Sequence, residues 1–320
     1  MKQNPFLITT EEQNGYSLLI IKNLLTNEYL SVIPELGARL KDLFLRSGEN
    51  IISLLRSYDP AKLESRDDLF TNAKLFPFAG RIKNGKYVFE NKEYILPINY
   101  PEENNACHGF VFDKKFDLVN TIINEEYGAC TFRYYFNYFQ AGYPFKTEIE
   151  ITYKLAIKDG LTCATKIINN SDSSIPVMDG WHPYFELGCP VDNLKMRIEP
   201  SELISVDSQN IPNGKTKIFD EFSSLTRING KHFDNCFKMN CGNGKVTTQI
   251  FSEEHNTQLN IWQETGMNKY NYVVIYTPAD RKSIAIEPMT SNVNSFNNHE
   301  GLIVLAPCEE LEMNYGIYID

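Results

Sequence analysis

The 320-residue chain is predicted to be all-β: a large antiparallel β-sandwich with few short helices. Strand-like runs dominate, in which apolar and polar residues alternate with a period of two. Asparagine, a common turn former, occurs 32 times and is scattered along the chain. A helical period is scarce, and only 60–75 could hold a turn or two of helix. We therefore expect one domain, 1–320, built from many short strands.

The expected strands follow one another along the chain. A hairpin is predicted in 86–96 around Glu90-Asn91-Lys92, and 131–139 is rich in Tyr and Phe. The Asp159-Gly160 pair, with positive φ angles, is expected to turn one strand into the next, 161–168. The C-terminus alternates again over 311–319. The clearest alternation is in 147–158, whose predicted inward face carries Ile149, Ile151, Tyr153, Leu155 and Ile157.

Charge and hydropathy argue against some classes of binding partner. The net charge of −10 argues against nucleic acid or an anionic membrane, since both require clustered Lys and Arg. No apolar run approaches the length of a membrane-spanning helix, and 1–13 is polar without the apolar core of a secretory signal. The cytoplasm is the expected location.

Seven cysteines are widely spaced and form no C-x-x-C pair, so neither a disulfide framework nor a zinc site is expected. Most should be small buried hydrophobes. No G-x-G-x-x-G, P-loop or G-x-S-x-G motif stands where it would matter, which removes the usual signs of nucleotide cofactors and serine hydrolases.

Two of the five histidines have unusual neighbours. His108 precedes Gly109-Phe110, and His182 lies between Trp181 and Pro183. Such a constrained, partly apolar setting can hold an imidazole against a flat ligand, but it also suits a hydrogen-bonded core histidine.

Three charged residues are further candidates for a functional site. Glu287 ends an apolar strand before a proline, where it is either a buried base with a raised pKa or a solvent-facing strand end. Arg81 follows an apolar, glycine-containing turn and could anchor a ligand or pin two loops together. Asp234 stands between aromatic residues, where its carboxylate could accept hydrogen bonds from sugar hydroxyls or form a turn.

Taken together and in this order, these residues resemble the aldose 1-epimerase (galactose mutarotase) family. The resemblance extends along nearly the whole chain, and its pieces are Leu75–Arg81, Asn84–Tyr87, Glu93–Leu96, His108-Gly109, His182–Phe185, Asp234–Phe237, Tyr276–Pro278 and Ile286–Pro288.

The resemblance implies a galactose mutarotase-like sandwich that binds a free monosaccharide on its concave face. Glu287 matches the family's general base and His182 its general acid, while Arg81, His108 and Asp234 match sugar-binding positions. We expect Glu287 ionised, His182 protonated, and the two separated by about a sugar ring. Opening and reclosing a hemiacetal needs only such an acid and base, so no cofactor or metal is expected.

The sequence also departs from the family pattern. Gly80 stands where an Asn is usual, Phe110 replaces the second Gly of His-Gly-Gly, and 272–276 contains no Gln. The specificity contacts are therefore expected to differ, and galactose is not assumed.

Three alternatives stay open. The first is a hexose-6-phosphate 1-epimerase, which needs more basic residues than Arg81, Lys83 and Lys86. The others are an inactive sugar-binding protein of the same fold and, with little support from spacing, a metallohydrolase using His108, His182 and Glu287.

Overall fold

The computed structural model describes residues 4–63, 69–137, 140–240 and 242–320. Within these residues the chain is almost entirely antiparallel β-structure, which confirms the predicted fold class. The helices described are short: η1 (Pro34–Leu36), η2 (Pro60–Lys62), η3 (Val191–Asn193) and α2 (Ser295–Asn298). None of them is long and apolar enough to cross a membrane.

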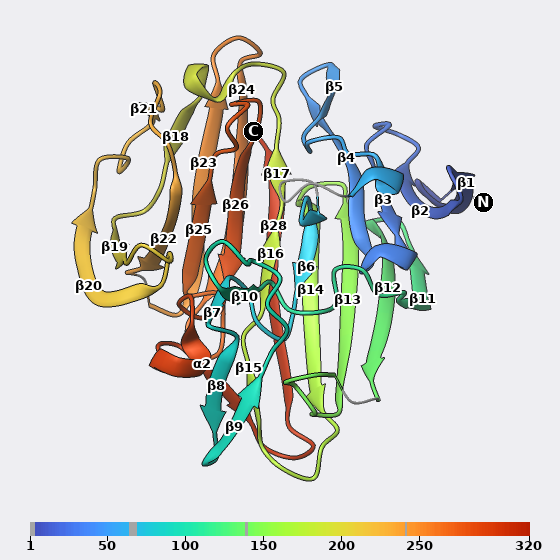
Figure 1. The fold of residues 1–320 in the computed structure, drawn as a ribbon. Coiled ribbons are helices and arrows are strands. Elements are labelled where there is room, and N and C mark those ends of the chain that lie inside the picture. The colour runs from blue at the N-terminus through green and yellow to red at the C-terminus, as the bar shows by residue number, and fades with distance from the viewer. Residues whose placement is uncertain (1–3, 64–68, 138–139, 241) are drawn as a thin grey trace.

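A nine-stranded sheet is the largest layer (Figure 1). Its order is β11 (Asp117–Ile123), β12 (Tyr127–Phe136), β13 (Thr147–Ala156), β14 (Gly160–Asn169), β28 (Glu310–Ile319), β24 (Thr257–Thr265), β23 (Gly244–Ser252), β18 (Lys195–Arg197) and β21 (Thr226–Arg227).

An eight-stranded sheet carries most of the site described below. Its order is β20 (Pro212–Phe219), β19 (Ser201–Val206), β22 (Asp234–Met239), β25 (Tyr272–Tyr276), β26 (Ile284–Met289), β16 (Gly180–His182) and β6 (Ala73–Leu75), and β17 (Tyr184–Phe185) also pairs with β26.

The N-terminal five-stranded sheet lies beside β11–β13, at the right of Figure 1. It contains β1 (Phe6–Gln13), β2 (Tyr16–Asn23), β3 (Tyr29–Ile33), β4 (Arg39–Ser47) and β5 (Asn50–Ser53). Three two-stranded sheets complete the fold: β7 (Arg81–Lys83) with β10 (Asn105–Cys107), β8 (Lys86–Phe89) with β9 (Lys92–Ile95), and β15 (Ile175–Val177) with β27 (Ile303–Leu305). Apolar residues from all three large sheets form one continuous core.

The predicted hairpins are confirmed, with two corrections. β13 buries its odd-numbered residues as far as Leu155, but Ile157 follows the end of the strand and is 42% exposed. In the turn that follows, Gly160 has a positive φ of 63° and Asp159 does not. A β-carbon at Gly160 would lie 2.4 Å from the carbonyl oxygen of Ile317, so only glycine fits there.

Asparagine has the predicted role in turns. Of the 17 described non-glycine residues with positive φ, 11 are Asn. Of the helix expected in 60–75, the structure shows η2 and a helical Leu69, while 73–75 is strand β6 and 64–68 lie outside the described residues. The aromatic strand is β12, and 138–139 lie outside the description.

The six described cysteines are free thiols, five of them buried and Cys308 exposed. Cys241 lies outside the described residues.

Candidate active site

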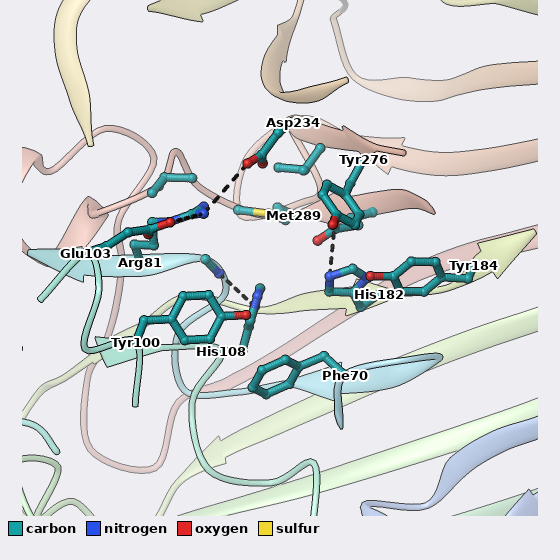
Figure 2. Close-up of a pocket in the computed structure, with 14 residues that line it drawn as sticks. Phe70, Arg81, Tyr100, Glu103, His108, His182, Tyr184, Asp234, Tyr276 and Met289 are labelled. Atoms are coloured by element: carbon teal, nitrogen blue, oxygen red, sulfur yellow. Dashed lines mark hydrogen bonds and ion pairs between the residues drawn. The ribbon is translucent and has the colours of Figure 1, made fainter. Parts of the chain in front are cut away.

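A cavity of about 150 Å³ lies over the middle strands of the eight-stranded sheet, and all five predicted site residues line it (Figure 2). Side chains two apart on a strand point to the same face, so Val274 and Tyr276 of β25 enter together, as do Glu287 and Met289 of β26. The full lining is Phe70, Gly80, Arg81, Tyr100, Glu103, His108, His182, Tyr184, Asp234, Val274, Tyr276, Glu287, Met289 and Val293.

His182 and Glu287 are in direct contact, with 3.4 Å between Nε2 and Oε1. The register explains this: β16 and β26 pair Gly180 with Met289, and the same alignment places His182 opposite Glu287. Directly opposed residues of neighbouring strands are only about 5 Å apart at their β-carbons. The expectation that a sugar ring separates the two is therefore wrong.

Burial determines the protonation of this pair. The two side chains are 7% and 3% exposed. Loss of water raises the pKa of Glu287 well above its usual range, and the nearby Asp234 carboxylate raises it further while Arg81 opposes the shift. Burial lowers the pKa of His182 to about 3. Burial in this cavity thus favours a protonated Glu287 beside a neutral His182, the reverse of the expected state, with the same total number of protons.

The imidazole of His182 is fixed from several sides. Its ring stacks on that of Tyr184, with 4.8 Å between the ring centroids and an interplanar angle of 4°, and the centroid of the His108 ring lies 5.3 Å from that of His182 in a T-shaped arrangement. Asn72 holds the strand itself, because its backbone N–H donates to the carbonyl of His182 and its side-chain oxygen accepts from the N–H of Tyr184. The acid–base pair therefore has little freedom to move.

Arg81 lies between two carboxylates on the other side of the cavity (Figure 2). Its Nε donates to Glu103 at 2.5 Å, and one terminal nitrogen is 3.8 Å from Asp234 Oδ2. Burial alone would lower the pKa of Arg81, but the hydrogen bond to Glu103 and the charge of Asp234 raise it above its usual value. Arg81 is thus a fixed cation that holds the rim together and faces the ligand space.

His108 has a left-handed backbone with φ of 65°, and its Nδ1 accepts the N–H of Gly80 at 3.3 Å. The following Gly109 also has a positive φ, and a β-carbon there would lie 2.1 Å from the carbonyl oxygen of Phe76. Only glycine fits such a position, which explains the His-Gly pair of the sequence.

Sequence reasoning missed five lining residues: Phe70, Tyr100, Glu103, Met289 and Val293. Glu103 is the most important of them because it is the main partner of Arg81. Its only sequence signal was its place in a polar stretch, Pro101–Asn105, that ends three residues before His108. Among the described residues, no three His, Cys, Asp or Glu side chains are grouped so that they could hold a metal ion.

Comparison with known proteins gives one consistent result. The family profile of aldose 1-epimerase matches residues 22–318. The chain is 23% identical over 303 residues to the uncharacterized protein YihR of Escherichia coli (strain K12), covering 92% of each chain.

Solved structures share the fold. A galactose mutarotase-like protein from Clostridium acetobutylicum superposes with a TM-score of 0.86 at 22% identity, covering 99% of each chain. The galactose 1-epimerase of Lactobacillus acidophilus NCFM gives a TM-score of 0.80 at 17% identity, with the same coverage.

Proposed function

The chain belongs to the aldose 1-epimerase family, and on this premise we propose that it interconverts the α and β anomers of a free aldose. The observation that carries the proposal is the 3.4 Å contact between His182 and Glu287 inside the cavity. Both atoms that exchange protons in this reaction, the hydroxyl oxygen O1 and the ring oxygen O5, are bonded to the same carbon, C1. An acid and a base that act on them must therefore be neighbours.

The proposed reaction moves two protons and breaks one bond. The Glu287 carboxylate takes the proton of the O1 hydroxyl while the His182 imidazolium protonates O5, and the C1–O5 bond opens. The aldehyde turns about the C1–C2 bond, and closure on its other face returns both protons. The reaction starts when Glu287 passes its proton to His182, which the contact between them allows.

The charge around the cavity favours a neutral sugar. Arg81 is already paired with Glu103 and lies near Asp234, and Lys83, outside the cavity lining, is paired with Asp207. A phosphate in the cavity would meet the carboxylates of Glu103 and Asp234 as well as a net charge of −10. Aromatic side chains that line the cavity, such as Tyr276, provide apolar surface that suits the C–H groups of a sugar instead.

Anomer exchange measured by saturation-transfer NMR tests the proposal on a panel of free and 6-phosphorylated sugars. Free aldoses should exchange faster, with glucose and galactose within about tenfold in kcat/KM, a gap of ~1.4 kcal/mol. The variant Glu312→Gln on the outer face of β28 is a matched control and should keep full activity. Strong preference for a 6-phosphate would favour a phosphosugar epimerase, and no exchange of any sugar would favour a binding protein.

A further inference from the structure

Glu103 connects Arg81 to a distant part of the chain. The Nε of Arg81 donates to Oε2 of Glu103 at 2.5 Å, and Nη2 lies 3.3 Å from Oε1 (Figure 2). The two side chains are only 14% and 16% exposed, so solvent screens the pair little. In such a two-point contact the plane of the carboxylate determines the plane of the guanidinium, and both residues line the cavity.

A glutamate does not fix the plane of its own carboxylate. Rotation about its last torsion is broad, so a further donor is needed to hold one orientation. Asn210 is such a donor, because its Nδ2 lies 3.2 Å from Oε1 of Glu103, the same oxygen that faces Nη2 of Arg81. Asn210 therefore acts on the side chain that aims Arg81.

Asn210 belongs to the turn 207–211, which joins β19 and β20 at the edge of the eight-stranded sheet. The turn has a fixed shape, because the carboxylate of Asp207 accepts the backbone N–H groups of Gln209 and Ile211 at 2.9 and 3.1 Å. Asn210 itself has a left-handed φ of 57°, a conformation that asparagine tolerates well.

Two hydrogen bonds hold this turn beside Glu103. The Nε2 of Gln209 donates to the backbone carbonyl of Glu103 at 2.9 Å, and the carbonyl of Gln209 accepts Nδ2 of Asn105 at 3.0 Å. Asn105 is fully buried at the start of β10, the strand that pairs with β7 and thus with Arg81. The turn is therefore fixed relative to both members of the ion pair.

We infer that Asn210 and Glu103 are positioning residues for sugar binding: Asn210 orients the Glu103 carboxylate, which in turn orients Arg81. The inference rests on the proposed function, because it takes the ligand of the cavity to be a free aldose. A cation that is already oriented loses little freedom when the sugar binds. The two residues should therefore strengthen sugar binding and leave the proton transfers of His182 and Glu287 unchanged.

Titration of the full chain with glucose, followed by NMR, gives Kd, and saturation transfer gives KM and kcat. Asn210→Ala should raise Kd and KM about fivefold, because a hydrogen bond to a charged group is lost. The value of kcat should change by less than about twofold. Asn210→Asp keeps the shape but places a second carboxylate against Glu103, so it should raise Kd further, about twentyfold.

The matched control is Asn213→Asp, the same change in the same hairpin. The side chain of Asn213 bonds to the backbone of Val206 and Lys215, away from Glu103. Kd and KM should stay those of the parent in this variant, and circular dichroism should be unchanged in all of them.

The double variant Glu103→Gln, Asn210→Asp separates positioning from a simple loss of contacts. An amide at position 103 can still accept from Arg81 and can donate to a carboxylate at position 210. The hydrogen bond is thus restored with its direction reversed, and the local charge is kept. Glucose should bind the double variant about fivefold more tightly than it binds either single variant.

The outcomes distinguish this inference from the proposed reaction. An unchanged Kd in both Asn210 variants, an equal loss in Asn213→Asp, or additive losses in the double variant would overturn the positioning roles while anomer exchange continues. The expected changes in Kd on a chain that exchanges no anomers would support the positioning roles and overturn the epimerase. A chain that binds neither glucose nor galactose would overturn both.

Discussion

The two faces of the eight-stranded sheet each carry a buried acid–base pair, only a few residues apart. His182 and Glu287 face the cavity, whereas Lys74 and Asp179 are fully buried on the opposite, core-facing side. The alternation of strand β16 produces this arrangement, because Trp181, opposite Lys74 in the ladder, points away from the cavity that His182 enters.

The two pairs differ in what surrounds them. Asp179 Oδ2 accepts hydrogen bonds from Lys74 and from the Tyr270 hydroxyl, and the Lys74 ammonium also lies 4.4 Å from the Trp181 ring. Burial lowers the pKa of Lys74 to about 8 and raises that of Asp179, although each charge opposes the shift of the other. Both pairs therefore have perturbed pKa values. Only contact with an open cavity distinguishes His182 and Glu287, the candidates for chemistry, from the structural ion pair of Lys74 and Asp179.

The largest effect expected from this comparison is on turnover. Glu287→Gln keeps the shape of the side chain but removes its ability to exchange a proton, so kcat should fall by about 10²–10⁴. The free energy of unfolding should stay close to that of the parent. Anomer exchange and urea unfolding measure the two quantities, and near-normal turnover would place the base elsewhere.

Substitutions in the core pair, Lys74 and Asp179, should lower stability instead of turnover. Asp179→Asn leaves the Lys74 ammonium buried without its counter-charge, which should cost about 3–5 kcal/mol of stability. The double variant Lys74→Met, Asp179→Leu should recover much of this loss, because an apolar pair can replace a buried ion pair. Unfolding in guanidinium measures both. Full stability combined with lost turnover would mean that Asp179 takes part in the chemistry.

Sequence reasoning succeeded where local pattern determines structure. The alternation in 147–156 and the turn at Gly160 predicted the central hairpin. The motifs that resemble the family predicted five residues that line one cavity. It failed on relations between distant strands. Alternation tells which face a residue occupies but not which residue lies opposite it, so the contact of His182 with Glu287 was missed. Glu103 was missed for the same reason, since its partner Arg81 lies across a loop.

A substitution at the rim of the cavity should have a smaller effect, on substrate binding. Arg81→Lys keeps the charge but loses the fork that holds Glu103 through two nitrogens. KM should rise about tenfold, equivalent to ~1.4 kcal/mol, while kcat changes much less. Arg133→Lys is a matched control, because Arg133 also pairs with glutamates but does so on the outer face of the nine-stranded sheet. Equal effects of both variants would remove Arg81 from the binding site.

The pH dependence of kcat/KM follows from the proton held by the cavity pair. The pair has one mobile proton between the pKa of His182, about 3, and the raised pKa of Glu287. Below this window the pair gains a second proton and loses its base; above it, the pair loses its acid. Activity should therefore show no decline near pH 6.5, where an ordinary histidine titrates, and should fall as pH rises through the raised pKa. A decline centred near 6.5 would mean that His182 titrates normally.

The smallest effect is a displacement of that alkaline decline. The Asp234 carboxylate raises the pKa of Glu287 by repelling its negative form. Asp234→Asn removes the charge and keeps the shape, so the pKa of Glu287 should fall and the alkaline decline should move to lower pH. The shift should be modest because the Asp234 side chain is 36% exposed and solvent screens its charge. Asp207→Asn, which removes a carboxylate paired with Lys83 outside the cavity lining, should leave the profile in place. A decline that moves upward in Asp234→Asn, or moves equally in both variants, would show that Glu287 does not set the alkaline limit.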